Sequence, residues 1–330
     1  MINQTLKFVP TVDNQQIAVW ELSDADVAPK QANNKQTLLF IHGAFSDKGV
    51  CLGIASYFVS LGFQCYIMEW RGHGSSSQPQ TDYNLEDIGL YDVQATLSYL
   101  LDDLKVENLH CVTHSGGGIC LTICLTQYPE YIARINSITM FACQVFAAAT
   151  TPFNFVKILT LKAITGKLGV VKGKPLKLGT MNESYYLLSQ WMDWNLNQNF
   201  SSYNPTPLAK QLLTLTRLAT KRHSLRQSKL KPIKSKQNKT STTSQIVDYR
   251  SLMPNITSPI YAIGAACDPI APPNGCLQYL QAFKNSKNQW REFSVANGDL
   301  DDYNHTRIFL SRHAAKEVWP TALDWIERHC

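Results

Sequence analysis

The sequence lacks the long apolar runs that mark a membrane protein. None of its 330 residues lies in a stretch of eighteen apolar residues without a charge. The first ten residues, MINQTLKFVP, have no basic segment followed by an apolar one of the kind that directs export. We therefore expect neither a membrane span nor an export signal, and we expect a cytoplasmic location.

The sequence also lacks the cysteine spacing of a metal site. Its nine cysteines are an odd number, and they do not form the paired C-x-x-C spacing of structural zinc. Most of them lie in apolar segments, where cysteine is usually a small buried thiol. We expect unpaired cysteines in a reducing compartment, with no metal and no cofactor.

Acidic residues are absent from one basic segment. Residues 221–240, KRHSLRQSKLKPIKSKQNKT, carry eight Lys or Arg, so the rest of the chain is slightly acidic although the net charge is +6. The interpretation we favour is a solvated loop, and a weak contact with an anionic membrane surface is the alternative. Nucleic acid is not an expected partner, because the segment has no interleaved aromatic side chains on which bases stack.

What the sequence does have is a regular alternation of apolar and amphipathic segments. TLLFIH (37–42), NLHCVT (108–113) and INSITMFACQ (135–144) are short and apolar, which is typical of strands buried on both faces. Longer segments between them, such as 84–104, have apolar residues at helical spacing. The alternation predicts an α/β fold with a mostly parallel central sheet and helices on both faces.

The alternation stops between residues 145 and 253. This stretch holds helix-like segments, such as 154–168 and 184–194, and no segment that resembles a buried strand. A further apolar strand then begins near residue 258. The pattern predicts one core domain made of residues 1–144 and 254–330, with an inserted helical cap, or lid, at 145–253.

Three consecutive glycines follow Ser115 in HCVTHSGGGIC (110–120), between a predicted strand and a predicted helix. Each glycine costs a helix up to about 1 kcal/mol relative to alanine, so the run indicates that some group approaches this backbone closely. A serine on a sharp strand-to-helix turn presents its Oγ above the sheet edge and needs small neighbours. The backbone N–H of Gly116 would then face a developing oxyanion.

Three loops in the first half of the chain carry a family resemblance. Residues 113–117, THSGG, resemble the nucleophile elbow of the α/β-hydrolase family, with Thr113 in place of the first glycine of G-x-S-x-G. The HGA sequence at 42–44 resembles the family's HG-x loop, which implies that the Ala44 N–H is the second oxyanion donor. WRGHGSS (70–76) is similar to the R-G-x-G-x-S loop, which is architectural, so His73 receives no catalytic role.

The resemblance also implies an acid and a base after the cap, because the family order is serine, then acid, then histidine. CDPIAPP, from residue 267, is similar to the D-x-x-x-P loop and implies Asp268 as the acid. YNHT, from residue 303, resembles the terminal histidine loop and implies His305 as the base. Asp299, Asp301 and Asp302 are alternative acids, for which we prefer plain loop solvation.

The implied activity is that of a serine esterase or lipase, which cleaves a small-molecule or lipid ester through an acyl-enzyme at Ser115, Asp268 and His305. His114 and Phe45 are the expected pocket residues. The cap favours an apolar acyl group through its aromatic residues Phe153, Phe155, Tyr185, Tyr186, Trp191 and Trp194. The alternatives are an acyltransferase or thioesterase with the same triad, and a non-catalytic binding protein that uses the basic segment 221–240.

Overall fold

The computed structural model describes residues 2–24, 36–203 and 246–330. The described residues up to 200 and from 249 onward belong to one compact unit, and residues 201–203 and 246–248 belong to a second one. In the second unit, Ser201 and Asp248 are joined by an antiparallel bridge. The basic segment 221–240 lies outside the described residues, so its predicted roles stay predictions.

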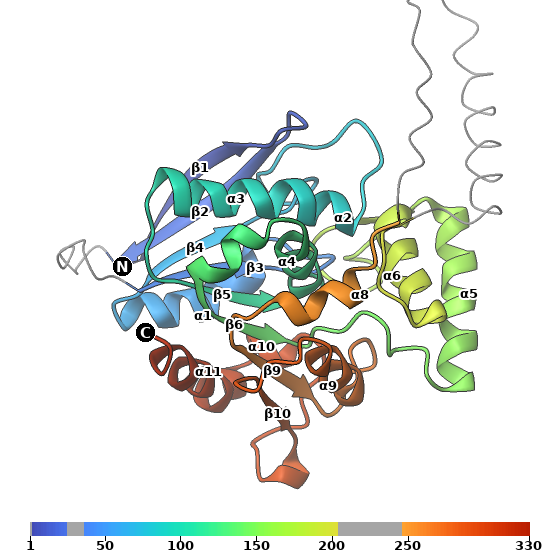
Figure 1. The fold of residues 1–330 in the computed structure, drawn as a ribbon. Helices are drawn as coiled ribbons and strands as arrows, with labels where there is room; N and C mark the ends of the chain where they lie inside the picture. Colours follow the sequence, from blue (N-terminus) through green and yellow to red (C-terminus); the bar gives the residue numbers. More distant parts are fainter. Residues whose placement is uncertain (1, 25–35, 204–245) are drawn as a thin grey trace, which may run out of the picture. The chain divides into compact units, whose positions relative to one another are not determined.

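One eight-stranded sheet organises the first unit (Figure 1), in the order β1-β2-β4-β3-β5-β6-β9-β10. β2 pairs antiparallel with β1 and β4, and the remaining neighbours pair in parallel. The predicted mostly parallel sheet is therefore confirmed. The strands are β1 (Ile2–Pro10), β2 (Gln16–Asp24), β3 (Thr37–Ile41), β4 (Gln64–Met68), β5 (Leu109–His114), β6 (Ile135–Phe141), β9 (Ile260–Ala265) and β10 (Gln289–Phe293).

The central strands are short apolar segments because both of their faces are covered. Every residue of β3, β5 and β9 is buried, whereas most residues of the edge strand β1 are not. A strand covered on both faces needs apolar side chains at successive positions rather than at alternate ones. This requirement explains why these segments could be located from the sequence.

Helices cover both faces of the sheet (Figure 1). α1, α10 and α11 pack together on one face, and α4 with its neighbours η2 and α8 packs on the other. The helices of the core are α1 (Lys48–Ser60), α2 (Leu85–Asp87), η2 (Ile88–Val93), α3 (Gln94–Ser98), η3 (Tyr99–Asp103), α4 (Gly116–Gln127), η4 (Pro129–Arg134), α8 (Tyr249–Leu252), η5 (Met253–Asn255), α9 (Pro273–Gln281), η6 (Val295–Asn297), α10 (Arg307–Leu310) and α11 (Arg312–Glu327).

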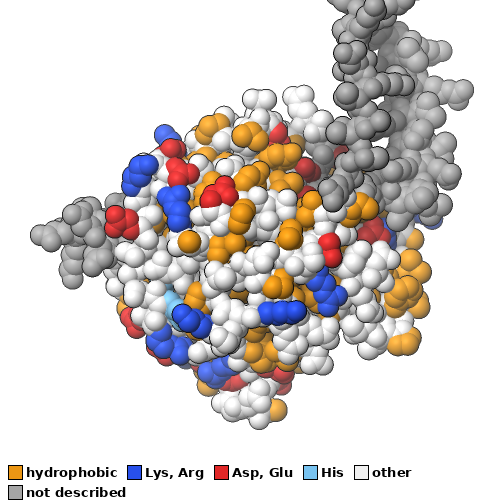
Figure 2. All heavy atoms as spheres, viewed as in Figure 1, with side chains coloured by type: hydrophobic (Ala, Val, Ile, Leu, Met, Phe, Trp, Pro, Cys, Tyr) orange, Lys and Arg blue, Asp and Glu red, His pale blue; other side chains and the backbone are white. Residues whose placement is uncertain are grey.

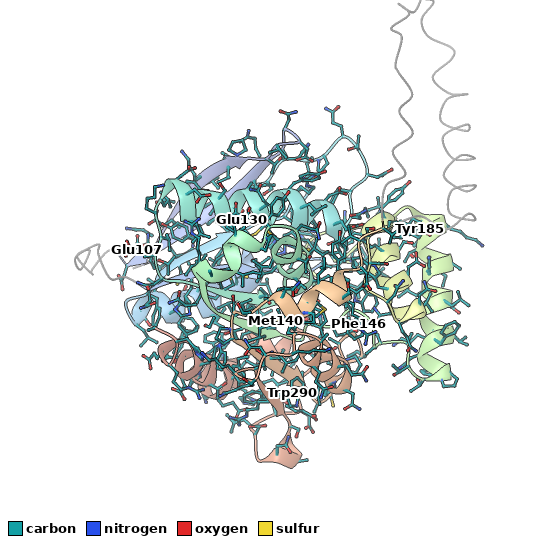
Figure 3. All side chains as sticks on the ribbon, in the orientation of Figure 1. Glu107, Glu130, Met140, Phe146, Tyr185 and Trp290 are labelled. Carbon is teal, nitrogen blue, oxygen red and sulfur yellow. The ribbon has the colours of Figure 1, made fainter. Side chains whose placement is uncertain are left out.

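Large apolar side chains fill the space between the sheet and the helices. Phe40 of β3, Phe58 of α1 and Trp325 of α11 are fully buried in one cluster. Figure 3 shows Met140 and Phe146 in the interior, and both side chains are 2% exposed. Burial of each such side chain stabilises the fold by roughly 1.5–3 kcal/mol.

All nine cysteines are unpaired, and only Cys267 and Cys330 are exposed. Burial raises the pKa of the Cys143 thiol, which lies beside the turn after β5, to about 12. The buried cysteines thus act as small apolar side chains, as expected. In the part of the chain that the structure describes, no helix has the length and apolar character needed to cross a membrane.

Residues 145–200 belong to the same compact unit as the core, and they hold two helices and a short strand pair of the segment predicted as the cap. α5 (Pro152–Leu168) packs against α6 (Tyr185–Asn197), and Lys162 of α5 forms an ion pair with Asp193 of α6. β7 (Val170–Val171) pairs antiparallel with β8 (Glu183–Ser184). The sequence did not indicate this pair, because a strand of two residues is too short to show a periodic pattern.

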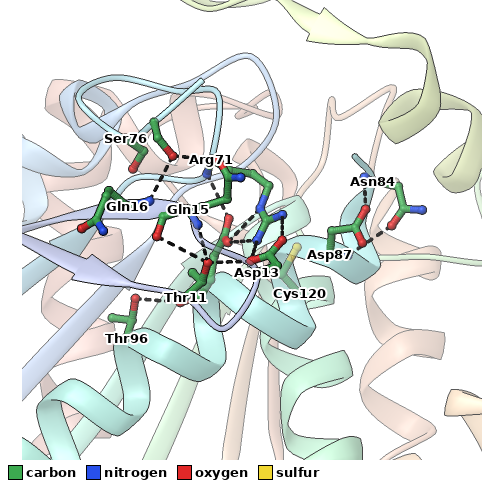
Figure 4. Close-up of polar contacts among 12 residues, drawn as sticks. Thr11, Asp13, Gln15, Gln16, Arg71, Ser76, Asn84, Asp87, Thr96 and Cys120 are labelled. Atoms are coloured by element: carbon green, nitrogen blue, oxygen red, sulfur yellow. Dashed lines mark hydrogen bonds and ion pairs between the residues drawn. The ribbon is translucent and has the colours of Figure 1, made fainter. Parts of the chain in front are cut away.

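Arg71, at the start of the loop that follows β4, connects three segments of the core (Figure 4). Its Nε and Nη2 donate to Asp92 Oδ1 at 2.9 and 2.7 Å, and its Nη1 donates to Asp13 Oδ2 at 2.6 Å. Burial raises the pKa of Asp92 to about 6, although the guanidinium of Arg71 opposes the shift. The loop from 70 to 76 is therefore held by charge-assisted bonds on its buried side.

We predict that Arg71→Ala lowers the free energy of unfolding by about 3–5 kcal/mol, because it removes the guanidinium that the structure places at the buried carboxylate of Asp92 and leaves that group the backbone N–H of residue 71. The matched control is Arg134→Ala, which removes the ion pair of Arg134 with Asp102, where both side chains are substantially exposed. The control should lose less than about 1 kcal/mol. Urea unfolding followed by fluorescence measures both values, and equal losses would contradict the assignment.

Candidate active site

Ser115 occupies a strained turn between β5 and α4. Its φ is +53° and its ψ is −123°, a backbone conformation that side-chain-bearing residues rarely adopt. Its N–H donates to the carbonyl of Phe141 at 2.9 Å, which fixes the turn to the neighbouring strand. The strain is thus concentrated at one residue whose hydroxyl lies at the carboxyl edge of the sheet.

The glycines after Ser115 are needed because other atoms lie against the backbone. A Cβ on Gly117 would lie 2.3 Å from the carbonyl oxygen of Ile41. A Cβ on Gly118 would lie 2.6 Å from Cys143 Sγ and 3.0 Å from Thr113 Oγ1. Gly118 therefore leaves room for the hydroxyl that Thr113 brings in place of a glycine.

The structure brings together the three side chains that were predicted as nucleophile, base and acid. His305 Nε2 lies 2.8 Å from Ser115 Oγ, and His305 Nδ1 lies 2.7 Å from Asp268 Oδ2. Because a carboxylate only accepts, Nδ1 carries the proton and the Nε2 lone pair faces the serine hydroxyl. Asp268 is itself oriented by the N–H groups of Ile270 and Ala271, which donate to its Oδ1 at 2.8 and 2.9 Å.

The three alternative acids have other partners. Asp299 accepts from Arg291 Nη2 at 2.6 Å and from a backbone N–H, and Asp302 accepts from the N–H of Val295 at 2.9 Å. Asp301 forms an ion pair with Arg307. Asp268 is the carboxylate that the structure places at His305, so the geometry favours it over these rivals.

Both predicted oxyanion donors lie next to Ser115 or to a residue that touches it, since Gly116 follows Ser115 and Ala44 follows Gly43. A Cβ on Gly43 would lie 2.7 Å from Ser115 Cβ, so the loop after β3 runs directly against the serine. Among the described residues, no acceptor bonds the N–H of Ala44 or of Gly116. Both N–H groups thus remain available to a ligand, and that of Gly116 belongs to the first turn of α4.

His42 fixes the peptide group that carries the Ala44 N–H. Its Nδ1 lies 2.8 Å from the carbonyl oxygen of Gly43, and its Nε2 accepts the N–H of Trp70 at 3.1 Å. Burial lowers the pKa of His42 to about 3, so the ring is neutral and Nδ1 is the donor. Because a trans peptide is planar, holding its carbonyl on one side directs its N–H to the other.

The two expected pocket residues have different surroundings. His114 is buried, its Nε2 lies 2.9 Å from the carbonyl oxygen of His305, and its ring stacks on Phe309 at 5.0 Å between centroids. Burial lowers its pKa to about 3, so Nε2 donates and supports the backbone of His305. Phe45 is half-buried, and it lies in the turn that follows Ala44.

Sequence reasoning missed Glu183. Its fully buried carboxylate accepts the N–H of Phe45 at 2.8 Å and contacts His73 Nε2 at 2.8 Å. His73 therefore contacts a residue of the segment predicted as the cap, in addition to shaping its own loop. One signal was available, because Glu183 is the only acidic residue between Glu130 and Asp193.

The arrangement combines a hydroxyl, an imidazole, a buried carboxylate and two free backbone donors at one sheet edge. Such a set can activate the hydroxyl for attack on a carbonyl carbon and stabilise the resulting oxyanion. In the described ranges, no three His, Cys, Asp or Glu side chains are gathered as ligands for a metal ion.

Comparisons with known proteins agree with this architecture. Residues 36–296 match the model of a family described as alpha/beta hydrolase fold. An esterase from Exiguobacterium antarcticum superimposes with a TM-score of 0.59 at 13% identity, covering 98% of this chain and 100% of its own. An esterase from Thermogutta terrifontis superimposes with a TM-score of 0.55 at 11% identity, covering 98% of this chain and 99% of its own.

The enol-lactonase from Burkholderia xenovorans LB400 is also similar, with a TM-score of 0.53 at 14% identity, covering 97% of this chain and all of its own. No curated protein matches the sequence. At such low identities, the structural likenesses concern the fold.

We predict that stability falls as the pH is lowered below 6.5, the ordinary pKa of histidine, because His42 and His114 stay neutral when folded but take up a proton when unfolded. His114→Gln retains an N–H for the His305 carbonyl and does not titrate. Between pH 6 and 4, the unfolding free energy of the variant should fall by about 1.4 kcal/mol less per pH unit than that of the wild type. Urea unfolding at each pH measures the slopes, and identical slopes would refute the assignment of a neutral His114.

Proposed function

Because the chain belongs to the α/β-hydrolase fold family, we propose that it is a serine hydrolase that cleaves carboxylic esters through an acyl-enzyme. The observation that carries the proposal is the continuous hydrogen-bonded chain from Ser115 through His305 to Asp268. A structural serine has no need of a strained turn, an imidazole and a buried carboxylate joined in that order.

In the first half of the reaction, Ser115 Oγ attacks the ester carbonyl while His305 Nε2 takes up the hydroxyl proton. Asp268 holds the resulting imidazolium through Nδ1–H and remains ionised. His305 then gives the proton to the leaving alcohol, and the C–O bond of the ester breaks. In the second half, a water molecule repeats the attack, and Ser115 recovers its proton as the acid leaves.

The N–H groups of Ala44 and Gly116 stabilise the negative charge that develops on the carbonyl oxygen. They are suited to this role because both are free and both lie beside Ser115. The removal of one such donor costs about 3–4 kcal/mol of transition-state stabilisation in other hydrolases. The His114 contact with the His305 carbonyl keeps the base in place between the two steps.

We propose an apolar acyl group for the substrate. The inner side of the cap is apolar, since Ile158 of α5 and Met192 of α6 form a buried cluster with Ala148 and Ala149. Trp191 of α6 donates to the carbonyl of Gln144, three residues beyond the end of β6, at 3.4 Å. The cluster thus adjoins the carboxyl edge of the sheet, where the acyl chain would lie.

A fluorophosphonate probe and a series of chromogenic esters test the proposal. The wild type should be labelled covalently, and Ser115→Ala should not be labelled at all. Asp268→Asn should fold normally and lose about 10⁴-fold in kcat, because the amide favours the wrong tautomer of His305. Turnover should rise with acyl-chain length from two to eight carbons, since the apolar surroundings that we propose for the acyl chain would remove each added methylene from water.

The same experiment separates the alternatives. An unlabelled wild type would favour a non-catalytic binding protein and would overturn the proposal. Faster turnover of a thioester than of the matched ester would indicate a thioesterase, and ester formation from an added alcohol would indicate an acyltransferase. A predominance of free acid from the ester supports the proposal.

A further inference from the structure

The turn that carries the Ala44 N–H is held in place by the cap. Phe45 has a φ of +59°, which is unfavourable for a residue with a side chain. Its N–H donates to Glu183 Oε1 at 2.8 Å, and its carbonyl accepts the N–H of Met181 at 3.0 Å. Both backbone groups of the strained residue are therefore bonded to cap residues, not to the core.

The contact between the cap and this turn is close. A Cβ on Gly179 would lie 2.1 Å from the carbonyl oxygen of Phe45, so the cap backbone fits against the turn only at a glycine. Thr180 adds a hydrogen bond to Asp47, just beyond the turn, at 3.2 Å. Residues 179–183 are thus one continuous contact that fixes the peptide after Ala44, while His42 fixes the peptide before it.

The burial of the Glu183 carboxylate costs more free energy than one accepted backbone N–H would justify. Its side chain is fully buried, and its Oε2 has no partner among the described residues. Its Oε1 also contacts His73 Nε2, while His73 Nδ1 donates to the carbonyl of Arg71 at 3.0 Å. Although burial alone would lower the pKa of His73, the contact with Glu183 raises it above its ordinary value, which favours the protonated ring. A charged acceptor makes a shorter and stronger bond than a neutral one.

We infer that Glu183 is a positioning residue for the oxyanion donor at Ala44. Glu183 touches neither the substrate nor the reacting atoms, and it acts by holding Phe45 in its strained conformation. This role makes stabilisation of the transition state depend on the seating of cap residues 179–183. The inference rests on the proposed function, because it assigns a second residue to the same oxyanion hole.

The test compares three variants of Glu183 with a matched cap variant. Glu183→Ala removes the acceptor, Glu183→Asp keeps the charge but withdraws it by one methylene, and Glu183→Gln keeps an acceptor for Phe45 and can donate to a neutral His73. Asp193→Ala is the control, because it breaks the α5–α6 ion pair with Lys162 and leaves the turn untouched. The kcat of each protein is divided by the fraction of sites that fluorophosphonate titrates at completion.

Glu183→Ala should lose about 10²-fold in kcat per titrated site, with KM changed by less than about threefold, as for the loss of one oxyanion donor. Its inhibition by a boronic acid, which forms a tetrahedral adduct with serine, should weaken by the same factor. Glu183→Asp should show the same pattern, and Glu183→Gln should recover kcat to within about tenfold of the wild type.

Unchanged kcat per titrated site in folded Glu183→Ala or Glu183→Asp would overturn the inference, as would an equal loss in Asp193→Ala. If Glu183→Ala does not fold, the comparison of the Asp and Gln variants decides. Failure of the proposed function is a separate result, since the wild type would then not react with fluorophosphonate.

A different observation, the outer face of α5, carries a second inference. α5 faces the rest of the unit through a narrow stripe in which Ile158 and Thr165 are buried. Figure 2 shows hydrophobic side chains gathered on the surface over this helix, and Phe153 is 78% exposed. The exposed apolar residues are Phe153, Phe155, Val156, Leu159, Leu161, Ile164 and Leu168, followed by Val170, Leu176 and Leu178.

The charge on this surface has one sign. Residues 146–182 contain six lysines and no acidic residue. Lys162 is paired with Asp193, whereas the other five are exposed and form no ion pair within the described ranges. They are Lys157, Lys167, Lys172, Lys174 and Lys177. Lysines around an apolar helix face are typical of segments that lie in the interface of an anionic membrane.

The charges also indicate which partner could cover the apolar face of α5. A second copy of the chain would bring the same five lysines together across a two-fold axis. Residues 204–245 of this chain do not match the charge of the five lysines either, because they carry ten Lys or Arg and no acid. The geometry points to an anionic phospholipid surface as the partner of α5 and residues 170–178, which we call the cap surface.

Co-sedimentation with lipid vesicles tests this second inference, in the Ser115→Ala background so that the lipid is not consumed. The protein should bind phosphatidylglycerol vesicles at least about tenfold more tightly than phosphatidylcholine vesicles, and added salt should weaken the binding. The double variant Phe153→Ser/Ile164→Ser should weaken it about tenfold or more. Lys157→Gln/Lys167→Gln should reduce the preference for the anionic lipid.

The matched control is Val12→Ser/Val295→Ser, which removes exposed apolar side chains that lie outside the cap surface. This variant and the deletion of residues 221–240 should retain binding. The inference is overturned if the protein does not sediment, if the variants in α5 bind like the control, if the deletion abolishes binding, or if the protein is a dimer that the α5 variants dissociate. None of these outcomes depends on whether Ser115 is a nucleophile.

Discussion

The two hydrogen bonds of the His305 ring are the contacts on which the account depends. They join residues that are 190 and 37 positions apart in the chain, so they form only when the parallel sheet brings the ends of β5 and β9 to the same edge. The backbone strain at Ser115 is stabilised by the same packing, through its bond to Phe141. A fold that holds a serine in this conformation therefore also sets the direction in which its hydroxyl points.

Three buried histidines around this edge differ in the direction in which the structure shifts their pKa values. His42 and His114 are neutral because they are buried, and each uses one ring nitrogen to hold a backbone carbonyl next to the site. His73 is buried too, but the contact with Glu183 raises its pKa. Burial alone thus does not decide the direction of a pKa shift, because an acidic partner can reverse it.

Much of this arrangement could be predicted from the sequence, because it depends on short local patterns. The buried strands are continuous apolar segments, and the glycines after Ser115 are required by the close approach of Ile41 and Cys143. Glu183 could not be found in the same way, since its partners lie 110 and 138 positions away and its own strand has two residues. The positions of the cap's aromatic side chains could not be predicted either, because composition does not reveal that Phe153 is exposed while Trp194 is buried.

The most direct test of the central claim is a crystal structure of the protein after reaction with a fluorophosphonate. The account predicts a phosphorus atom bonded to Ser115 Oγ, with one phosphonyl oxygen about 2.7–3.1 Å from the backbone nitrogens of both Ala44 and Gly116. His305 should remain within hydrogen-bond reach of Asp268. An adduct on another residue, or a phosphonyl oxygen that faces neither nitrogen, would contradict it.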